Sequence, residues 1–236
     1  MKAFLLAAGL GTRLKPLTDH TPKCLLPIQG TPLLGIWLEL CKQHGITEVL
    51  INAHSHVDQV KNYVAGSRSG VSIRLSEEAT LLGSAGTLRA NADWAARERD
   101  FFVLYGDVLT NVDLTRLLAF HRARKVIATI GVYEVTNPTQ CGIVTVDDAG
   151  IVRDFVEKPA NPTSNLAFTG VLIATPAIFN SVPHKFPADI GFDVLPKLIG
   201  RMAAVKVSDY LLDIGTAEKY EHAQATWPGL RPVGVR

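Results

Sequence analysis

Short apolar runs recur along the first half of the chain, at residues 2–8, 47–53 and 101–105. The segments between them carry apolar residues at the three-to-four-residue spacing of amphipathic helices. Continuous apolar runs of this length are typical of parallel strands that are covered on both faces. The pattern therefore predicts an α/β fold in which strands and helices alternate.

Flanking residues mark where the helices begin and end. Pro32 after Thr31 suits the first turn of a helix, and Gly45 suits the end of the same helix. By similar criteria the other predicted helices run from Asn111 or Asp113 through His121, over about 191–201 and over about 216–226.

The second half has a different pattern, because from about residue 126 strand-like segments are separated by turns instead of helices. Strands are expected within residues 128–135, 141–157 and 166–175, and Asp147–Gly150 is typical of a hairpin turn. This half is therefore predicted to be more antiparallel than the first.

Composition narrows the classes of protein. The 236 residues are 47% hydrophobic, enough for one sizeable core, and 24 basic residues nearly balance 22 acidic ones. Such a balance gives no strong field to attract nucleic acid or an anionic membrane, so we expect a small partner. The apolar start MKAFLLAAGLGTR is too short for a membrane span and lacks a signal-peptide cleavage pattern. Three widely spaced cysteines suit the reducing cytoplasm.

The first candidate ligand-binding residues follow directly after the first predicted strand. Gly9 and Gly11 would let backbone amides approach phosphate oxygens, and Arg13, Lys15 and Lys23 add three cationic groups in a proline-pinned segment. The third glycine of a dinucleotide fingerprint is missing, as is the Gly-Lys-Ser/Thr of a Walker loop. The alternatives are a loop that wraps a triphosphate and a solvated basic loop.

The segment GLGTRLKPLTDHTPKCLLPI resembles the signature of the sugar-1-phosphate nucleotidylyltransferases. This family includes glucose-1-phosphate thymidylyltransferase, UTP-glucose-1-phosphate uridylyltransferase and mannose-1-phosphate guanylyltransferase. The resemblance implies that Arg13 contacts the departing pyrophosphate and that Lys23 binds phosphate beside the reacting phosphorus. The nucleotide site implied by it comprises Ala8, Gly9, Gly11, Thr12, Arg13, Lys23, Glu78, Gly83 and Gly86, and the catalytic residues are Arg13, Lys23 and Asp107.

Two aspartates are candidate magnesium ligands, since transfer of a phosphoryl-type group needs charge neutralisation at the phosphate oxygens. Asp107 follows the apolar run FFVLY and one glycine, although a turn aspartate would have the same sequence. Asp213 lies in LLDIGTAE, which resembles the family element W-x-D-x-G-T-P-E, with Leu211 in place of the aromatic residue and Ala217 in place of proline. By the resemblance both aspartates bind Mg²⁺.

The acceptor side is predicted from three further motifs. Glu157 and Lys158 end a strand and by themselves suggest a surface ion pair, but they match the family's E-K-P element, in which the glutamate binds sugar hydroxyls and the lysine binds the sugar phosphate. Thr169 and Gly170 occupy the place of a sugar-binding Asn-Ala-Gly, with Phe168 where the amide is usual. The loop LGSAGTL, which contains Gly83 and Gly86, resembles the family's base-side loop, and Glu78 is a candidate acceptor for the base.

The resemblance extends from Met1 to about Tyr220 and implies a three-layer α/β/α sandwich with a mixed, mainly parallel sheet. We expect one domain over residues 1–236, with a nucleotide-binding half at about 1–125, a sugar-phosphate half at about 126–236 and no appended β-helix. The expected enzyme condenses an NTP with a sugar 1-phosphate in the cytoplasm, by Mg²⁺-dependent in-line attack, to give an NDP-sugar and pyrophosphate. Guanylyl or uridylyl transfer is favoured, and the enzyme could assemble with copies of itself.

Three alternatives remain at this stage. Cytidylyl transfer to another phosphorylated alcohol would use the same glycine loop without Glu157. A catalytically silent sugar-nucleotide-binding regulatory protein would bind product without turnover. His54 and His56, which alternation in a strand would place on one face, could form a ligand pair, but no cysteine or glutamate cluster accompanies them.

Overall fold

The computed structural model describes residues 1–231, so the last five residues of the predicted domain lie outside the described residues. The chain forms two compact units that interleave along the sequence. Unit 1 comprises Met1–Leu81, Leu104–Asp113 and the segment from Asp209 onward, and unit 2 comprises Leu82–Val103 and Leu114–Ser208. Residues that are distant in sequence therefore share one core in each unit.

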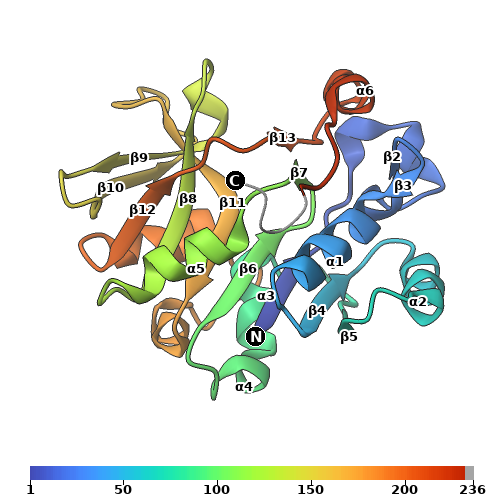
Figure 1. The fold of residues 1–236 in the computed structure, drawn as a ribbon, viewed down its shortest axis with the longest axis horizontal. Helices are drawn as coiled ribbons and strands as arrows, with labels where there is room; N and C mark the ends of the chain where they lie inside the picture. The colour runs from blue at the N-terminus through green and yellow to red at the C-terminus, as the bar shows by residue number, and fades with distance from the viewer. Residues whose placement is uncertain (232–236) are drawn as a thin grey trace. The chain divides into compact units, whose positions relative to one another are not determined.

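Unit 1 is built on parallel strands, as the apolar runs predicted (Figure 1). Strand β1 (Lys2–Leu6) pairs with β4 (Glu48–Ala53), which pairs with β5 (Ser72–Glu77). Helix α1 (Leu33–Gln43) connects β1 to β4, and α2 (Val57–Gly66) connects β4 to β5. β1 ends two residues before the predicted end at residue 8, which leaves Ala7 and Ala8 in the glycine loop.

Short elements surround these strands. Thr31 and Pro32 form β3 (Thr31–Pro32), which pairs with β2 (Pro27–Ile28), so Pro32 precedes α1 instead of occupying its first turn. Gly45 does follow the helix end, with a φ of +71° that suits glycine. The remaining elements of unit 1 are η1 (Thr12–Leu14), η2 (Leu17–Asp19), η3 (Lys23–Leu25), β7 (Val108–Thr110), β13 (Leu211–Asp213) and α6 (Ala217–Thr226).

Unit 2 is mainly antiparallel, as predicted. β10 (Val152–Glu157), β9 (Gly142–Val146), β11 (Leu166–Ala174) and β8 (Ala128–Glu134) pair in this order, and β12 (Met202–Lys206) joins β8 in parallel. The backbone N–H of Gly150 donates to Asp147 O at 2.8 Å and closes the predicted hairpin. The other elements are α3 (Ser84–Ala90), α4 (Ala92–Ala95), α5 (Leu114–Arg122), η4 (Pro138–Gln140), η5 (Pro176–Ser181), η6 (Ile190–Val194) and η7 (Leu195–Leu198). β6 (Phe101–Tyr105) crosses the unit boundary after Val103.

The helix expected at about 191–201 is wrong in type. The segment forms a π-turn over Ile190–Val194 and then a 3₁₀ turn over Leu195–Leu198. Pro196 has no N–H to donate to the carbonyl four residues earlier, so a regular α-helical ladder is broken there. In contrast, α6 matches the expected 216–226, and the Thr216 hydroxyl caps it by accepting from the Lys219 N–H.

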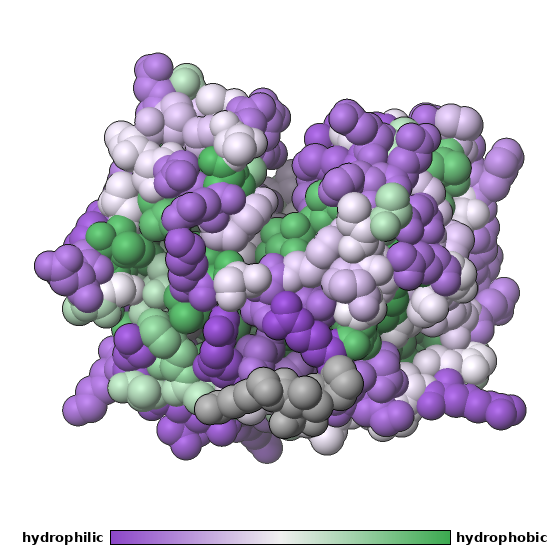
Figure 2. Space-filling view, turned by 45° about the horizontal axis from the view of Figure 1, so that its top comes forward, coloured by the Kyte–Doolittle hydropathy of each residue, from purple (hydrophilic) through white to green (hydrophobic). Residues whose placement is uncertain are grey.

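Apolar side chains of strands and helices fill the cores, with Trp37, Phe4, Phe101 and Phe102 among the largest fully buried residues. On the face drawn in Figure 2, polar side chains predominate and apolar ones form small patches between them. Among residues 1–231 no helix combines the length and apolarity that crossing a membrane requires. Parallel strands with connecting helices in unit 1, and mixed strands in unit 2, confirm the predicted α/β class.

A buried histidine in unit 2 makes stability depend on pH. His121 on α5 is almost inaccessible, and its ring nitrogens lie 2.9 Å from Thr129 Oγ1 and 3.5 Å from Asp100 Oδ1. Burial lowers the pKa of His121 below its ordinary 6.5, although the Asp100 carboxylate opposes this shift. The unfolded chain therefore takes up a proton first, and stability is lost as pH falls below about 6.5.

We expect His121→Gln to reduce that loss, because glutamine does not titrate. In urea unfolding, the decrease in the free energy of unfolding between about pH 7.5 and about pH 5.5 should shrink by up to roughly 1 kcal/mol in the variant. His44, whose pKa burial also lowers, is present in both proteins and cancels in the comparison. An equal decrease in variant and wild type would contradict the assignment.

Candidate active site

The glycine loop of unit 1 follows β1 and is held in shape by local hydrogen bonds. Gly11 has a φ of +64°, and its carbonyl accepts from the Leu14 N–H and from the Thr18 hydroxyl, both at 2.8 Å. Ala8 is buried, whereas Gly9 is exposed, and a Cβ built on Gly9 meets no heavy atom within 4 Å. The loop thus presents open backbone at Gly9, as a phosphate-binding loop requires.

Lys23, Asp107 and Asp213 come together in unit 1. Lys23 Nζ lies 2.9 Å from Asp107 Oδ2 and 4.0 Å from Asp213 Oδ1. The lysine side chain is only 9% exposed, whereas the two aspartates are 43% and 38% exposed. The lysine side chain is therefore largely buried, and both carboxylates remain partly accessible to solvent.

Backbone pairing brings the two aspartates together. Asp107 follows β6 through Gly106, whose N–H donates to Leu6 O at 2.9 Å at the end of β1. β7 and β13 pair antiparallel with Asp213 opposite Val108, and the Ile214 N–H donates to Asp107 O at 2.9 Å. Asp107 and Asp213 thus reach the same edge of unit 1 although 105 positions separate them in the sequence.

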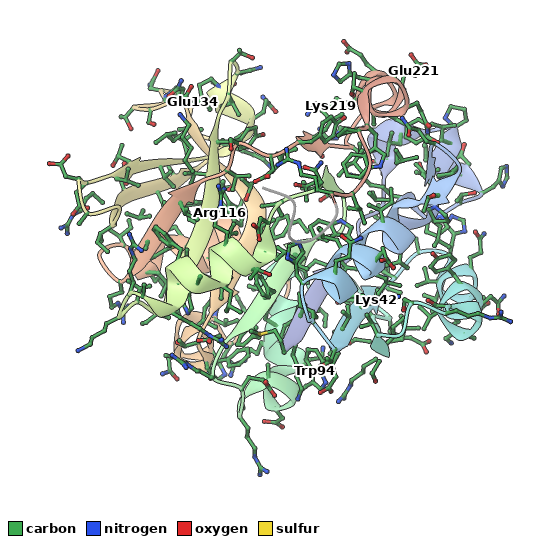
Figure 3. The ribbon with its side chains drawn as sticks, viewed as in Figure 1. Lys42, Trp94, Arg116, Glu134, Lys219 and Glu221 are labelled. Carbon is green, nitrogen blue, oxygen red and sulfur yellow. The ribbon has the colours of Figure 1, made fainter. Side chains whose placement is uncertain are left out.

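Arg13 and Lys219 extend this charged cluster. A Cβ at Gly215 would lie 2.8 Å from Asp213 Oδ2 and 3.2 Å from the Arg13 guanidinium. Because glycine has no Cβ, both side chains can lie this close to its backbone. Lys219 Nζ lies 3.0 Å from Asp213 Oδ2, and Figure 3 shows this lysine on α6 near β13. Lys219 was not among the predicted site residues, although it lies in the first turn of the helix that follows the Asp213 motif.

The donor set suits magnesium. Mg²⁺ in phosphate-transfer sites is held by one or two carboxylates, with water and substrate phosphate completing its shell. Asp107 and Asp213 provide two partly exposed carboxylates beside one ammonium group. Within residues 1–231 no group of three or more His, Cys, Asp or Glu side chains is placed to hold a metal ion.

Glu78 is buried at the end of β5 and is already hydrogen-bonded. Its Oε1 accepts from the Asn52 amide at 2.9 Å, and Asn52 Oδ1 accepts from the Ala7 N–H at 2.7 Å. The Glu78 carbonyl bonds His54 Nδ1 at 2.7 Å. Asn52 therefore links Glu78 to Ala7, where the glycine loop begins after β1. No sequence motif marked Asn52 for this role.

In unit 2, Glu157 lies in a slot between two glycines. A Cβ at Gly142 would lie 2.6 Å from Glu157 Oε2, and a Cβ at Gly191 would lie 2.4 Å from the same atom. Burial raises the pKa of Glu157, as does the nearby Asp189, while Lys158 opposes the rise. Lys158 Nζ lies 4.0 Å from Glu157 Oε1 and is exposed, whereas the Glu157 side chain is 15% exposed.

Lys158 has an unusual backbone. Its φ of +50° is in the left-handed region, and its N–H donates to Cys141 O at 2.9 Å. Such a conformation is strained for a residue with a long side chain and tends to occur at binding sites. The turn directs Lys158 out of the β10 strand pattern, with its ammonium 5.9 Å from the Phe192 ring centre.

The loop at residues 82–88 of unit 2 packs tightly against residue 188. Gly83 has a φ of +78°, and a Cβ there would lie 2.3 Å from Ala188 O. The N–H groups of Ala85 and Gly86 both donate to that carbonyl, at 2.9 and 3.2 Å. The sequence identified the two glycines of this loop but not Ala188, because the contact joins segments about a hundred residues apart.

Thr169 and Gly170 form an irregularity in β11. The register with β8 shifts between Phe168 and Leu172, and Gly170 has a φ of +78°. The Thr169 hydroxyl donates to Gly131 O at 3.0 Å and accepts from the Val171 N–H at 3.2 Å, so it is engaged within the sheet. A sugar contact at Thr169 or Gly170 stays a prediction. Phe168 packs edge-on against Phe155 at 6.5 Å.

Comparison with known proteins places this chain among nucleotide-transferring enzymes. A family model described as nucleotidyl transferase matches residues 2–228. The chain is 34% identical to a UTP–glucose-1-phosphate uridylyltransferase of Synechocystis sp., over 99% of this chain and 63% of the relative. It is 31% identical to the mannose-1-phosphate guanylyltransferase catalytic subunit beta of Drosophila melanogaster, over 93% of this chain and 60% of the relative. The chain thus spans less than two thirds of these relatives' length.

Solved structures agree on the fold. A UDP-glucose pyrophosphorylase complexed with UDP-glucose superposes with a TM-score of 0.84 at 22% identity, over 96% of this chain and 97% of that one. HddC from Yersinia pseudotuberculosis gives 0.79 at 24% identity, over 96% and 99%. These likenesses confirm the fold predicted from the signature. The family match over residues 2–228 shows that the chain belongs to the nucleotidyl transferase family, and the named relatives bear out the resemblance to sugar-1-phosphate nucleotidylyltransferases.

Proposed function

We propose that this protein condenses an NTP with a sugar 1-phosphate to form an NDP-sugar and pyrophosphate. The observation that carries the proposal is the cluster of Lys23, Asp107 and Asp213 beside the glycine loop of unit 1. A buried lysine and two accessible carboxylates at the ends of strands are the groups that transfer at a phosphorus atom requires.

The phosphate groups of the NTP are assigned to unit 1. The open backbone at Gly9 supports phosphate binding, and Arg13 and Lys23 would take up negative charge on the NTP as pyrophosphate departs. Asp107 and Asp213 would hold Mg²⁺, which when bound supplies further positive charge to the phosphate oxygens. Lys219, paired with Asp213, would hold that carboxylate in place.

The acceptor side is assigned to unit 2. Glu157, fixed between Gly142 and Gly191, would accept hydrogen bonds from sugar hydroxyls, and the exposed ammonium of Lys158 would bind the sugar phosphate. An oxygen of that phosphate attacks the α-phosphorus of the NTP, and the bond to the bridging oxygen of pyrophosphate breaks. The attacking phosphate is already ionised near neutral pH, so no general base is required and catalysis rests on alignment and charge.

Two bases are favoured for the NTP. Relatives at similar identity are named as uridylyl- and guanylyltransferases, which supports UTP and GTP equally. We further infer a reducing, cytoplasmic setting, since Cys24, Cys41 and Cys141 are all free thiols.

The test is pyrophosphate release by the purified chain with magnesium. GTP, UTP, dTTP, CTP and ATP are each crossed with hexose, heptose and amino-sugar 1-phosphates. We expect release that requires one NTP together with one sugar phosphate. Tight product binding without turnover in any combination would instead favour a regulatory protein.

Glu157→Ala separates sugar transfer from cytidylyl transfer to another phosphorylated alcohol. We expect kcat/KM for the sugar 1-phosphate to fall by roughly 10- to 100-fold, because hydrogen bonds to a charged group are lost, while the KM for the NTP changes little. The matched control is Glu134→Ala, whose exposed carboxylate pairs with Lys206 on the surface of unit 2 (Figure 3). An unchanged kcat/KM in Glu157→Ala would contradict the sugar-binding role.

A further inference from the structure

Two segments of unit 2 are bound to each other beside the Glu157 slot. The Ala188 N–H donates to Leu82 O at 2.9 Å, and Ala188 O accepts from the first turn of α3. The Ser84 hydroxyl donates to Asp189 Oδ2 at 2.8 Å and accepts from the Ile190 N–H at 2.7 Å. A single side chain of the loop at residues 82–88 thus fixes both Asp189 and Ile190.

The next residue forms one wall of the slot. Gly191 follows Ile190 directly, and the point where its Cβ would lie is 2.4 Å from Glu157 Oε2 and 3.2 Å from Asp189 Oδ1. The position of the Asp189–Gly191 segment therefore decides how much room the Glu157 carboxylate has. Asp189 is in turn held by two more bonds: its Oδ1 accepts from the Phe192 N–H at 3.1 Å, and its N–H donates to Asp193 Oδ2 at 2.8 Å.

We propose that Ser84 is a positioning residue for the acceptor, which acts through Asp189 and Ile190 to hold Gly191 against Glu157. The Glu157 carboxylate is then fixed in one orientation toward the hydroxyls of a sugar 1-phosphate. This inference rests on the proposed function and deepens it. It connects the loop assigned to the base with the carboxylate assigned to the sugar, through bonds that lie wholly within unit 2.

The charges around Glu157 provide an independent readout. Asp189, the residue before η6, and Lys158, the residue after β10, both act electrostatically on the Glu157 carboxylate. Lys185 forms an ion pair with Asp193 at 2.9 Å. The negative charge of Asp189 contributes to the raised pKa of Glu157. Asp189→Asn removes that charge, so the pKa of Glu157 should fall. It also leaves one side-chain oxygen, so that either the Ser84 hydroxyl or the Phe192 N–H loses its acceptor.

The experiment measures pyrophosphate release under magnesium with the active substrate pair. We expect Ser84→Ala to raise the KM for the sugar 1-phosphate about tenfold with the KM for the NTP nearly unchanged. In Ser84→Thr, which keeps a hydroxyl, the KM for the sugar 1-phosphate should lie close to the wild-type value. In Asp189→Asn, the acidic limb of kcat/KM for the sugar phosphate should move to lower pH. Ser67→Ala, which removes a comparable hydroxyl from unit 1, should behave like wild type.

Each outcome decides between the proposals. If wild type is active but Ser84→Ala leaves both KM values unchanged or raises both equally, the positioning role is wrong and the proposed function stands. If wild type turns over no substrate pair, both fall. If Ser84→Ala does not fold, Asp189→Asn decides: an acidic limb that stays in place overturns the coupling between this segment and Glu157.

Discussion

Replacing Asp107 with asparagine should lower kcat for pyrophosphate release by at least about a hundredfold, which corresponds to about 3 kcal/mol in the activation barrier. The carboxylate is 43% exposed and lies 2.9 Å from Lys23 Nζ, so its charge faces the side from which a phosphate and a metal ion would approach. Asparagine has nearly the same shape but cannot neutralise a cation. Most of the loss should therefore appear in kcat.

The same substitution should change the free energy of unfolding little, because the Asp107 carboxylate is 43% exposed and Asp213 remains 4.0 Å from Lys23. Steady-state kinetics and urea unfolding of the same preparation separate the two effects. Asp148→Asn, an identical change at an exposed turn position, is the control and should retain activity. Wild-type kcat in Asp107→Asn would remove this residue from the proposed metal site.

Gly83→Ala should produce the largest loss of stability among the glycine substitutions considered. The added Cβ would lie 2.3 Å from Ala188 O and 2.9 Å from Ala188 N, at a φ of +78° that disfavours side chains. The backbone of Gly83 or of Ala188 must therefore move. The hydrogen bonds from the first turn of α3 to Ala188 O are then lost. We expect a loss of about 3 kcal/mol, and a fall in Tm of roughly 6–12 °C for a chain of this size.

Gly66→Ala is the matched control, since a Cβ there meets nothing within 4 Å and the φ of Gly66 is not positive. Calorimetry on both variants at the same pH tests the difference. Equal Tm values for the two alanine variants would mean that the approach of Gly83 to Ala188 is not maintained in solution.

Much of the fold could be predicted because it follows from local patterns. The apolar runs correspond to β1, β4 and β6, the turn at Asp147–Gly150 forms, and α6 begins at a threonine that caps it. The segment at 191–201 could not be predicted, since apolar spacing suggested a helix while Pro196 breaks the α-helical hydrogen-bond ladder. In this segment the side-chain pattern favours an α-helix, whereas the missing N–H of Pro196 prevents its regular hydrogen bonding.

The site divides in the same way. Gly9, Gly11, Lys23, Asp107 and Asp213 are recognisable because each occurs in a short, specific string. What the strings omit are the partners that hold these residues. Asn52 and Gly215 act through contacts with the distant residues Glu78 and Arg13, whereas Lys219 lies only six positions after its partner Asp213.

By itself the sequence determined the α/β class, the family resemblance and the chemical groups at the strand ends, since these depend on side-chain type and short-range spacing. Only the tertiary structure decided which groups meet. The pairing of β7 with β13 brings Asp213 beside Asp107 and Lys23, and the bonds between the loop at 82–86 and the segment at 188–191 enclose Glu157. Such contacts follow from strand register and close backbone approach between residues about a hundred positions apart, which a one-dimensional pattern does not encode.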